Sequence, residues 1–218
     1  MMKDGSIKIS ILVSESIGNI SALLSKPARP KALLVLAHGA GASMTHHFME
    51  ELTKELVKKS ILVIRYNFPY MEKEKRMPDK PAIAEMTVGA IIEKAHKLFP
   101  KLPLYAAGKS FGGRMTSQYL AKACPAFVKG IIFYGFPLHP IGKPAIARAA
   151  HLTELSLPTL FLQGTKDKLA EWSLIEAVCS ALARATLIKL EGVDHSFKVG
   201  KREVFVELAE ATEIWMRG

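Results

Sequence analysis

The sequence predicts an α/β fold with a mostly parallel central sheet, an antiparallel N-terminal hairpin, helices on both faces and no lid domain. Three observations support this prediction. Short unbroken apolar runs, such as residues 32–37, are typical of strands that are covered on both faces. Segments with apolar residues at helical spacing alternate with these runs. The 218 residues, 49% of them hydrophobic, are enough to form one domain, residues 1–218, around a full core.

The first strands are expected to form a hairpin at the edge of the sheet. Apolar residues alternate with polar ones from Ile7 to Val13, and a Gly-Asn turn at residues 18–19 precedes a second strand at 20–24. Two prolines within residues 26–30 then end the hairpin. The chain continues into the buried strand 32–37, and from there strands and helices alternate.

The later elements follow from the same patterns. Phe48, Leu52 and Leu56 recur every four residues, which indicates a helix that ends near Ser60. Residues 71–81 are charged and contain prolines, so we expect an exposed loop there. Further helices are expected at 83–99, 114–123, 170–183 and up to 216, and further strands at 61–64, 105–107, 128–134, 157–163 and 186–190.

A serine lies at the turn between a predicted strand and a predicted helix. Gly108, Ser110 and Gly112 satisfy the pattern G-x-S-x-G, in which the serine is held on a sharp, strained turn with its hydroxyl clear of the sheet. The small neighbours are needed because bulky side chains would clash in such a turn. We therefore predict that Ser110 is a nucleophile, and the alternative is a glycine-rich turn that holds a serine by chance.

A serine nucleophile needs a base and a carboxylate that orients the base. Asp167 and His195 each follow a predicted strand at the same edge of the sheet as Ser110, and the chain order Ser, Asp, His is the one expected for this architecture. Asp194 is a competing carboxylate. Because it is adjacent to His195 in the sequence, its side chain is expected to point elsewhere.

Small residues at 38–43 follow the strand 32–37 directly, so backbone N–H groups there can approach a ligand closely. We predict an oxyanion hole formed by the N–H groups of Ala40 and Phe111, with His38 orienting the loop. The candidate substrate contacts are His38, Gly39, Arg65, Tyr66, Asn67, Arg114 and Leu138. For residues 65–67, an equal alternative is that their side chains anchor a loop. For Arg114, the alternative is a structural ion pair.

The segment between the strands 128–134 and 157–163 has no room for a lid. Glycines and prolines interrupt its first half, which leaves space for one short helix around 145–152. The pocket is therefore expected to be shallow and open, with a preference for acyl groups of about two to four carbons, because longer chains would gain little burial. The residues expected to form its apolar walls are Tyr66, Tyr70, Phe111 and Leu138.

Composition limits the other functions. The net charge is +10, but basic clusters at 54–59 and 73–76 are interleaved with glutamates, which favours a solvated surface over a nucleic-acid-binding face, although RNA binding stays open. Cys124 and Cys179 show no C-x-x-C spacing and are expected to be reduced core residues. We expect no metal, no cofactor and no membrane span, because neither H-E-x-x-H nor a long apolar run occurs, and a cytoplasmic location.

Taken together, residues 38–41, the pattern around Ser110, Asp167 and His195 resemble the α/β-hydrolase superfamily over nearly the whole chain. Residues 65–70, 108–115 and 137–140 also resemble a narrower group of small hydrolases. This group is similar to dienelactone hydrolases and is related to the testis-expressed hydrolase-like protein and to a scaffold subunit of the NSL chromatin complex. The resemblance implies an α/β-hydrolase fold and a catalytic triad. Dienelactone-type hydrolases typically carry a cysteine nucleophile, whereas this chain has Ser110.

Two hypotheses about function follow. The first is a serine hydrolase, esterase-like or thioesterase-like, that acts on a small acyl substrate. The second is an interaction or scaffold protein with a hydrolase fold and little catalytic activity, as some relatives of the narrower group are. The presence of all three triad residue types favours the first hypothesis.

Overall fold

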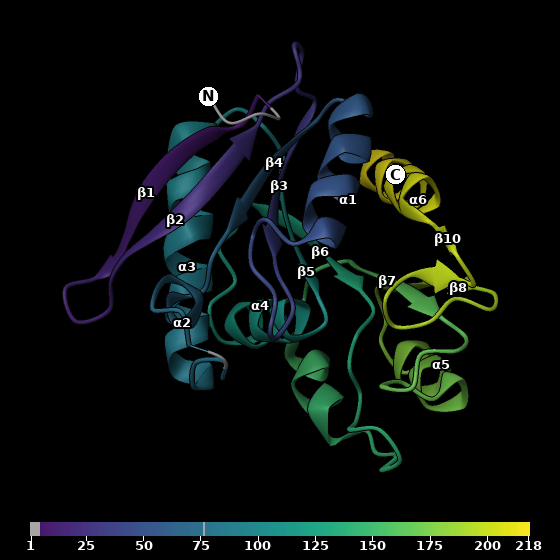
Figure 1. The fold of residues 1–218 in the computed structure, drawn as a ribbon. Helices are drawn as coiled ribbons and strands as arrows, with labels where there is room; N and C mark the ends of the chain where they lie inside the picture. The colour runs from purple at the N-terminus through teal and green to yellow at the C-terminus, as the bar shows by residue number, and fades with distance from the viewer. Residues whose placement is uncertain (1–4, 76) are drawn as a thin grey trace.

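The computed structural model describes residues 5–75 and 77–218. Eight strands form one sheet in the order β1-β2-β4-β3-β5-β6-β7-β8 (Figure 1). The hairpin β1–β2 is antiparallel and β2 pairs antiparallel with β4, while the other pairs are parallel. The strands are β1 (Ile7–Ser14), β2 (Gly18–Ser25), β3 (Ala32–Ala37), β4 (Ile61–Tyr66), β5 (Leu104–Lys109), β6 (Val128–Tyr134), β7 (Thr159–Gly164) and β8 (Ala185–Leu190). The predicted mostly parallel sheet with an N-terminal edge hairpin is confirmed.

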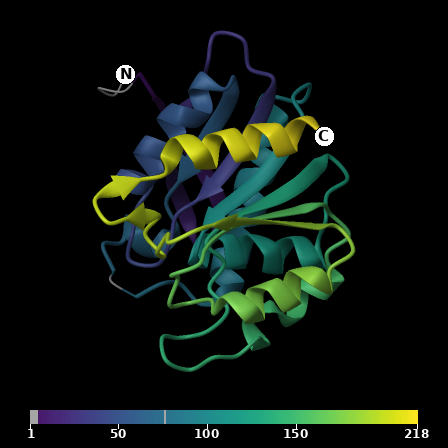
Figure 2. The ribbon, with the colours of Figure 1, turned by 90° about the vertical axis from the view of Figure 1, so that its right-hand side faces the viewer.

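Helices cover both faces of this sheet. Helices α1 (His47–Lys58) and α6 (Phe205–Arg217) pack on one face. Helices α3 (Pro81–Leu98), α4 (Phe111–Lys122) and α5 (Trp172–Ser180) pack on the other. Figure 2 shows α6 and α5 on opposite sides of the sheet. None of the helices in the described residues is long and apolar enough to cross a membrane.

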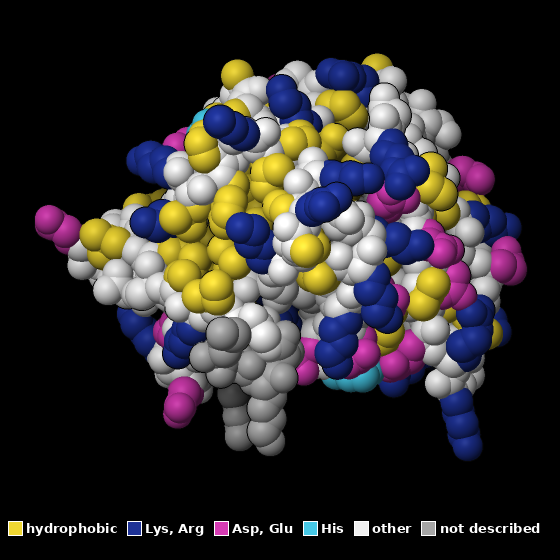
Figure 3. Space-filling view, turned by 90° about the horizontal axis from the view of Figure 1, so that it is seen from above, with side chains coloured by type: hydrophobic (Ala, Val, Ile, Leu, Met, Phe, Trp, Pro, Cys, Tyr) yellow, Lys and Arg dark blue, Asp and Glu magenta, His cyan; other side chains and the backbone are white. Residues whose placement is uncertain are grey.

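Basic side chains are distributed over the surface. On the face seen in Figure 3, lysines and arginines lie among acidic and apolar side chains and do not gather in one stripe. Some of them form exposed ion pairs within a helix, such as Lys58 with Glu55 at 2.6 Å. Pairs of this kind contribute about 0.3 to 0.5 kcal/mol each, so they are a minor source of stability.

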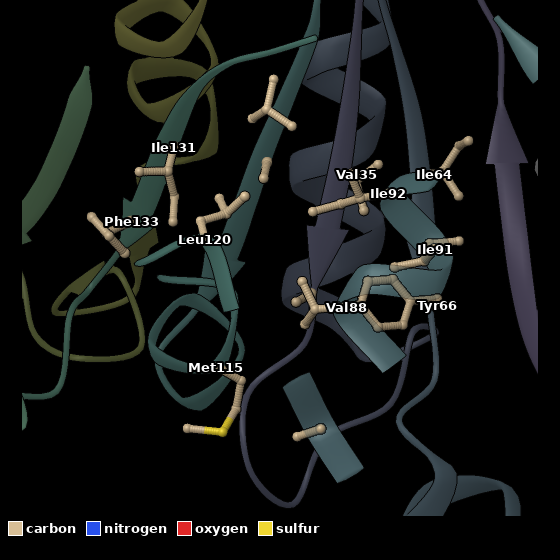
Figure 4. Close-up of a cluster of buried hydrophobic side chains, with 14 of the residues drawn as sticks. Val35, Ile64, Tyr66, Val88, Ile91, Ile92, Met115, Leu120, Ile131 and Phe133 are labelled. Atoms are coloured by element: carbon tan, nitrogen blue, oxygen red, sulfur yellow. The ribbon is translucent and has the colours of Figure 1, made fainter. Parts of the chain in front are cut away.

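The core consists of two layers that the sheet separates. Every residue of β3 is buried, and alternate side chains enter different layers: Leu33 and Val35 face α3 and α4, while Leu34 and Leu36 face α1 and α6. A strand covered on both faces must be apolar throughout, which explains the unbroken run in the sequence. Figure 4 shows part of the first layer, in which side chains of α3 and α4 meet those of β3, β4 and β6.

Several boundaries differ from the sequence prediction. Helix α4 begins at Phe111, directly after Ser110, and not at residue 114. A short helix α2 (Pro69–Glu72) takes up the first two residues of the expected loop, and the segment before β7 contains one 3₁₀ helix, η1 (Ala147–Glu154). A two-stranded ribbon, β9 (Lys198–Val199) and β10 (Arg202–Glu203), precedes α6. Strands of two residues are too short to produce a sequence period, so no pattern could indicate the ribbon.

The prediction that both cysteines lie in the core is wrong for one of them. Cys179 is buried on α5, but Cys124 is exposed because α4 has already ended at Lys122. Leu98, the last residue of α3, is likewise an apolar residue with 42% of its surface exposed. Leu98 ends its helix and Cys124 lies two residues beyond one, so neither is held against the core.

The ends of the parallel strands place the candidate residues close together. Ser110 follows β5 directly, Asp167 lies three residues beyond β7, and His195 lies in the loop after β8. Parallel strands end at the same edge of a sheet, which is where ligands bind in open α/β folds. The candidate site is therefore at this edge, between the loops that leave β3, β5, β7 and β8.

Candidate active site

Ser110 occupies a strained turn between β5 and α4. Its φ of 50° and ψ of −115° are unfavourable for a residue with a side chain. The turn is also too tight for side chains at its flanking glycines. A Cβ added at Gly108 would lie 2.1 Å from the backbone nitrogen of Gly113, and one added at Gly112 would lie 2.5 Å from the carbonyl oxygen of His38. These close approaches explain why the pattern needs glycine at both positions.

A hydrogen-bonded chain joins the three predicted triad residues. The Nε2 atom of His195 lies 3.0 Å from the Oγ atom of Ser110, and its Nδ1 atom lies 2.7 Å from the Oδ2 atom of Asp167. The Asp167 side chain is 1% exposed, whereas that of His195 is 26% exposed. A carboxylate that accepts from Nδ1–H keeps Nε2 free to accept a proton. The arrangement can therefore deprotonate the Ser110 hydroxyl.

The Asp167 carboxylate is fixed by two further hydrogen bonds. Its Oδ2 atom accepts from the side-chain amide of Gln163 at 2.7 Å, and its Oδ1 atom accepts from the N–H of Leu169 at 2.8 Å. The Oε1 atom of the same Gln163 side chain accepts from the N–H of Phe136 at 2.9 Å. Gln163 was not among the predicted site residues, although a lone amide within an apolar strand is a signal, because a buried amide must find partners.

Asp194, the competing carboxylate, stabilises its own loop. Its Oδ1 atom accepts from the N–H groups of Ser196 at 2.9 Å and Lys198 at 3.0 Å. This is the arrangement that its position next to His195 predicts. The carboxylate that contacts the His195 ring is that of Asp167.

The loop after β3 contributes the second wall of the site. His38 is buried, and its Nε2 atom accepts from the N–H of Phe68 at 3.1 Å, so its proton is on Nδ1, which donates to the carbonyl of Gly39 at 2.8 Å. Burial lowers the pKa of His38 to about 4, which keeps the ring neutral as these two bonds require. His38 thus orients the loop, and it does not face the cavity.

A cavity of about 580 Å³ lies beside Ser110 and His195. Its apolar wall comes from helices α1 and α6, and its polar wall comes from the loops at the strand ends. The lining residues are Gly39, Ala40, Ala42, His46, His47, Phe48, Met49, Lys109, Ser110, Leu169, His195, Ser196, Lys198, Glu203 and Phe205. Ala40 therefore lies at the cavity, and the N–H of Phe111 is the first of α4, where no intrahelical acceptor exists.

Most of the other predicted substrate contacts lie outside this cavity. Arg65 and Asn67 instead hold the loop at Met44: the Nη1 atom of Arg65 donates to its carbonyl at 3.2 Å, and the Oδ1 atom of Asn67 accepts from its N–H at 2.9 Å. Tyr66 and Leu138 are completely buried in the core. The loop that follows β3 covers the end of β4, so Arg65 and Asn67 anchor that loop and do not line the cavity.

Arg114 and all four residues expected to form apolar walls, Phe111 among them, also lie outside the lining of this cavity. Arg114 lies near Arg148 on η1, and burial together with this neighbour lowers its pKa, but it does not line the cavity. Tyr70 is 1% exposed and packs in the core with Tyr66 and Leu138. The cavity is lined instead by large apolar side chains of α1 and α6, Phe48, Met49 and Phe205, which the sequence could not indicate because these helices are far apart in the chain.

Lys109, the residue between Gly108 and Ser110, is a further component of the site that was not predicted from the sequence. It is 8% exposed, and its Nζ atom lies 3.1 Å from the Nε2 atom of His195. The ammonium group also faces the rings of Phe48 and Phe197, with 5.7 and 5.3 Å to their centroids. Burial lowers the pKa of Lys109 to about 8, although Asp167 and Asp194 raise it in part.

This burial predicts that Lys109→Met stabilises the protein. A lysine with a lowered pKa in the folded state destabilises the fold below that pKa, and the loss disappears as the pH rises towards the ordinary value of 10.5. At pH 7 the variant should therefore gain about 1 to 3 kcal/mol in the free energy of unfolding. Urea denaturation at pH 7 and pH 10 measures this gain, which should shrink at the higher pH. Equal stability of both proteins at pH 7 would contradict the prediction.

A family model described as an alpha/beta hydrolase domain matches residues 30–215. The chain belongs to this family. Among solved structures, an α/β serine hydrolase homologue from Coxiella burnetii is similar, with a TM-score of 0.78 and 18% identity over 99% of each chain. A lidless α/β serine hydrolase from Xanthomonas campestris has a TM-score of 0.77 and 19% identity over 97% of this chain and 94% of that one.

A dienelactone hydrolase from Anabaena variabilis is also similar, with a TM-score of 0.77 and 17% identity over 97% of this chain and 96% of that one. At these identities the similarity shows the fold. The predicted membership of the α/β-hydrolase superfamily is confirmed, as is the lidless form of the fold. The narrower resemblance to the testis-expressed protein and the NSL subunit stays a prediction.

Proposed function

We propose that this α/β-hydrolase domain is a serine hydrolase that cleaves small esters or thioesters through an acyl-enzyme intermediate. The observation that carries the proposal is the hydrogen-bonded chain Ser110–His195–Asp167 at the edge of a cavity. A serine hydroxyl is a weak nucleophile until a base and an oxyanion hole act together. Both have candidates within reach of Ser110 here.

In the first half of the reaction, the Oγ atom of Ser110 attacks the carbonyl carbon of the substrate while the Nε2 atom of His195 takes its proton. The N–H groups of Phe111 and Ala40 donate to the oxyanion of the tetrahedral intermediate. Collapse of the intermediate breaks the bond to the alcohol or thiol, which leaves with the proton of His195. The acyl group is then bound to Ser110.

In the second half, water replaces the leaving group. His195 takes a proton from the water, the resulting hydroxide attacks the acyl carbon, and Ser110 recovers its proton as the acid leaves. Asp167 stabilises the imidazolium that forms in both halves and keeps the ring in the required tautomer. The proposed steps use side chains and backbone N–H groups of this chain together with water, and the proposed partner is a small acyl substrate.

The scaffold hypothesis is less well supported. A protein whose only role is to bind partners would not require a strained serine in hydrogen-bond reach of a histidine, or a buried carboxylate behind that histidine. The cost of this arrangement is of the order of 1 to 3 kcal/mol for the backbone strain alone. Such strain is typical of functional sites, which favours catalysis.

A series of p-nitrophenyl esters tests the proposal. Without a lid to enclose a long chain, each added methylene beyond a short acyl group should gain much less than the about 0.8 kcal/mol of full burial. We expect kcat/KM to be highest for acyl groups of about two to four carbons, with no activation at a lipid interface. A steady rise through long-chain esters would contradict the open site. A folded protein that hydrolyses no ester or thioester would contradict the proposed function.

A further inference from the structure

We propose that Lys109 determines the substrate class of this site by binding a carboxylate on the acyl chain of the substrate. Its ammonium group competes with Ser110 for the lone pair of His195, and the substrate carboxylate releases that lone pair. This inference rests on the proposed hydrolase function and names the substrates that the same site would select.

The competition follows from the geometry at Nε2. This nitrogen faces two donors, the Oγ atom of Ser110 at 3.0 Å and the Nζ atom of Lys109 at 3.1 Å. With the proton on Nδ1 and donated to Asp167, Nε2 has a single lone pair. A charged donor makes a stronger hydrogen bond than a neutral hydroxyl. Lys109 therefore slows the transfer of the Ser110 proton to His195 without preventing it, because the two donors share Nε2.

Lys109 has no carboxylate of its own to bind. The Asp167 carboxylate already accepts from His195, Gln163 and Leu169, and no acidic side chain among residues 5–75 and 77–218 forms an ion pair with Lys109. Its contacts are Nε2 of His195 and two aromatic rings. Asp167 and Asp194 attract this ammonium group from a distance, but neither forms an ion pair with it. A buried ammonium group with no carboxylate in contact is unfavourable, so an anion that enters the cavity gains a strong partner.

The other charged residues that line the cavity are consistent with the binding of an anion. Its acidic lining residue, Glu203, is engaged by His47 at 2.9 Å and by Lys198 at 3.2 Å. Lys198 therefore already has a counter-ion, and its side chain is 45% exposed. Lys109 differs from Lys198 in both respects, because its side chain is buried and forms no ion pair with a carboxylate of the described residues. The pair of lysines at one cavity provides a matched comparison.

The distance between Lys109 and Ser110 limits the length of the substrate. Their Nζ and Oγ atoms share one hydrogen-bond partner, so they lie within the span of two hydrogen bonds. A carbonyl carbon at Ser110 and a carboxylate at Lys109 must belong to the same short chain. Monoesters or monothioesters of short dicarboxylic acids, of the succinyl type, meet this requirement.

The test compares monoethyl succinate with ethyl butyrate, two esters whose acyl chains have the same length and differ in the terminal carboxylate. Ethanol release gives kcat/KM for both in the wild-type protein, Lys109→Met and Lys198→Met. The wild-type protein should prefer the succinate ester. Lys109→Met should lose about tenfold to a hundredfold of this preference, and its turnover of ethyl butyrate should rise because Ser110 no longer shares Nε2. Lys109→Gln should lose the preference as well.

Lys198→Met should keep the preference within about threefold of the wild-type value, because Lys198 already pairs with Glu203. An unchanged preference in Lys109→Met, or an equal loss in Lys198→Met, overturns the role of Lys109. A neutral fluorophosphonate probe separates this result from a failure of the proposed function. Labelling with an unchanged ratio overturns the inference alone, whereas a folded wild-type protein with neither labelling nor turnover overturns both.

Discussion

Replacing Ser110 by alanine should lower kcat for a short ester by about 10⁶-fold, the loss typical of a removed serine nucleophile. The variant keeps His195 and Asp167 in place but has no atom that can form the acyl-enzyme. Steady-state hydrolysis of p-nitrophenyl butyrate measures the effect. The small alanine side chain fits the turn, so the folded structure should persist, and circular dichroism checks this.

Ser117 provides a matched control for this variant. It lies on α4 and its Oγ atom is 2.7 Å from the Nε2 atom of His151, so it forms a second serine–histidine pair. The hydroxyl also donates to the carbonyl of Arg114 at 2.9 Å, and the pair does not line the cavity at Ser110. Ser117→Ala should keep kcat within about threefold and lose about 1 kcal/mol of stability. A large loss in this control, with activity retained in Ser110→Ala, would contradict our assignment of the nucleophile.

Replacing Asp167 by asparagine should lower kcat by about 10⁴-fold. The amide of asparagine can donate to Nδ1 of His195, which would favour the tautomer with its proton on Nε2. That tautomer cannot accept the proton of Ser110. Kinetics with the same ester measures the loss.

Asp194→Asn is the comparison for Asp167. Its side chain would still present an oxygen to the N–H groups of Ser196 and Lys198, which are the partners of Asp194 in the structure. Because this side chain does not contact the His195 ring, we expect kcat within about threefold of the wild-type value. A larger loss in Asp194→Asn than in Asp167→Asn would overturn the assignment of the acid.

The sequence predicts those parts of the site that depend on local signals. Ser110, Asp167 and His195 each follow a strand, and the glycines around Ser110 are required by close backbone approaches at Gly108 and Gly112. These signals lie within a few residues of the side chain that they position. Buried strands such as β3 follow from the same kind of local signal, since a strand covered on both faces must be apolar throughout.

The parts that the sequence does not predict depend on contacts between distant segments. The cavity wall joins Phe48 of α1 to Phe205 of α6, and only the packing of both helices on one sheet face brings them together. Arg65 and Asn67 have the polar character of ligand contacts, yet the loop that follows β3 takes up their hydrogen bonds. Lys109 lies inside the motif, but its burial depends on rings that come from elsewhere in the chain.

The central claim is that Ser110 is an activated nucleophile, and covalent labelling tests it most directly. The wild-type protein is incubated with a fluorophosphonate, and intact-mass and peptide mass spectrometry locate the adduct. We predict one adduct, on the peptide that contains Ser110, and a strong decrease of labelling in His195→Ala because the base is lost. A folded wild-type protein that takes up no probe, or that carries the adduct on another residue, would contradict the claim.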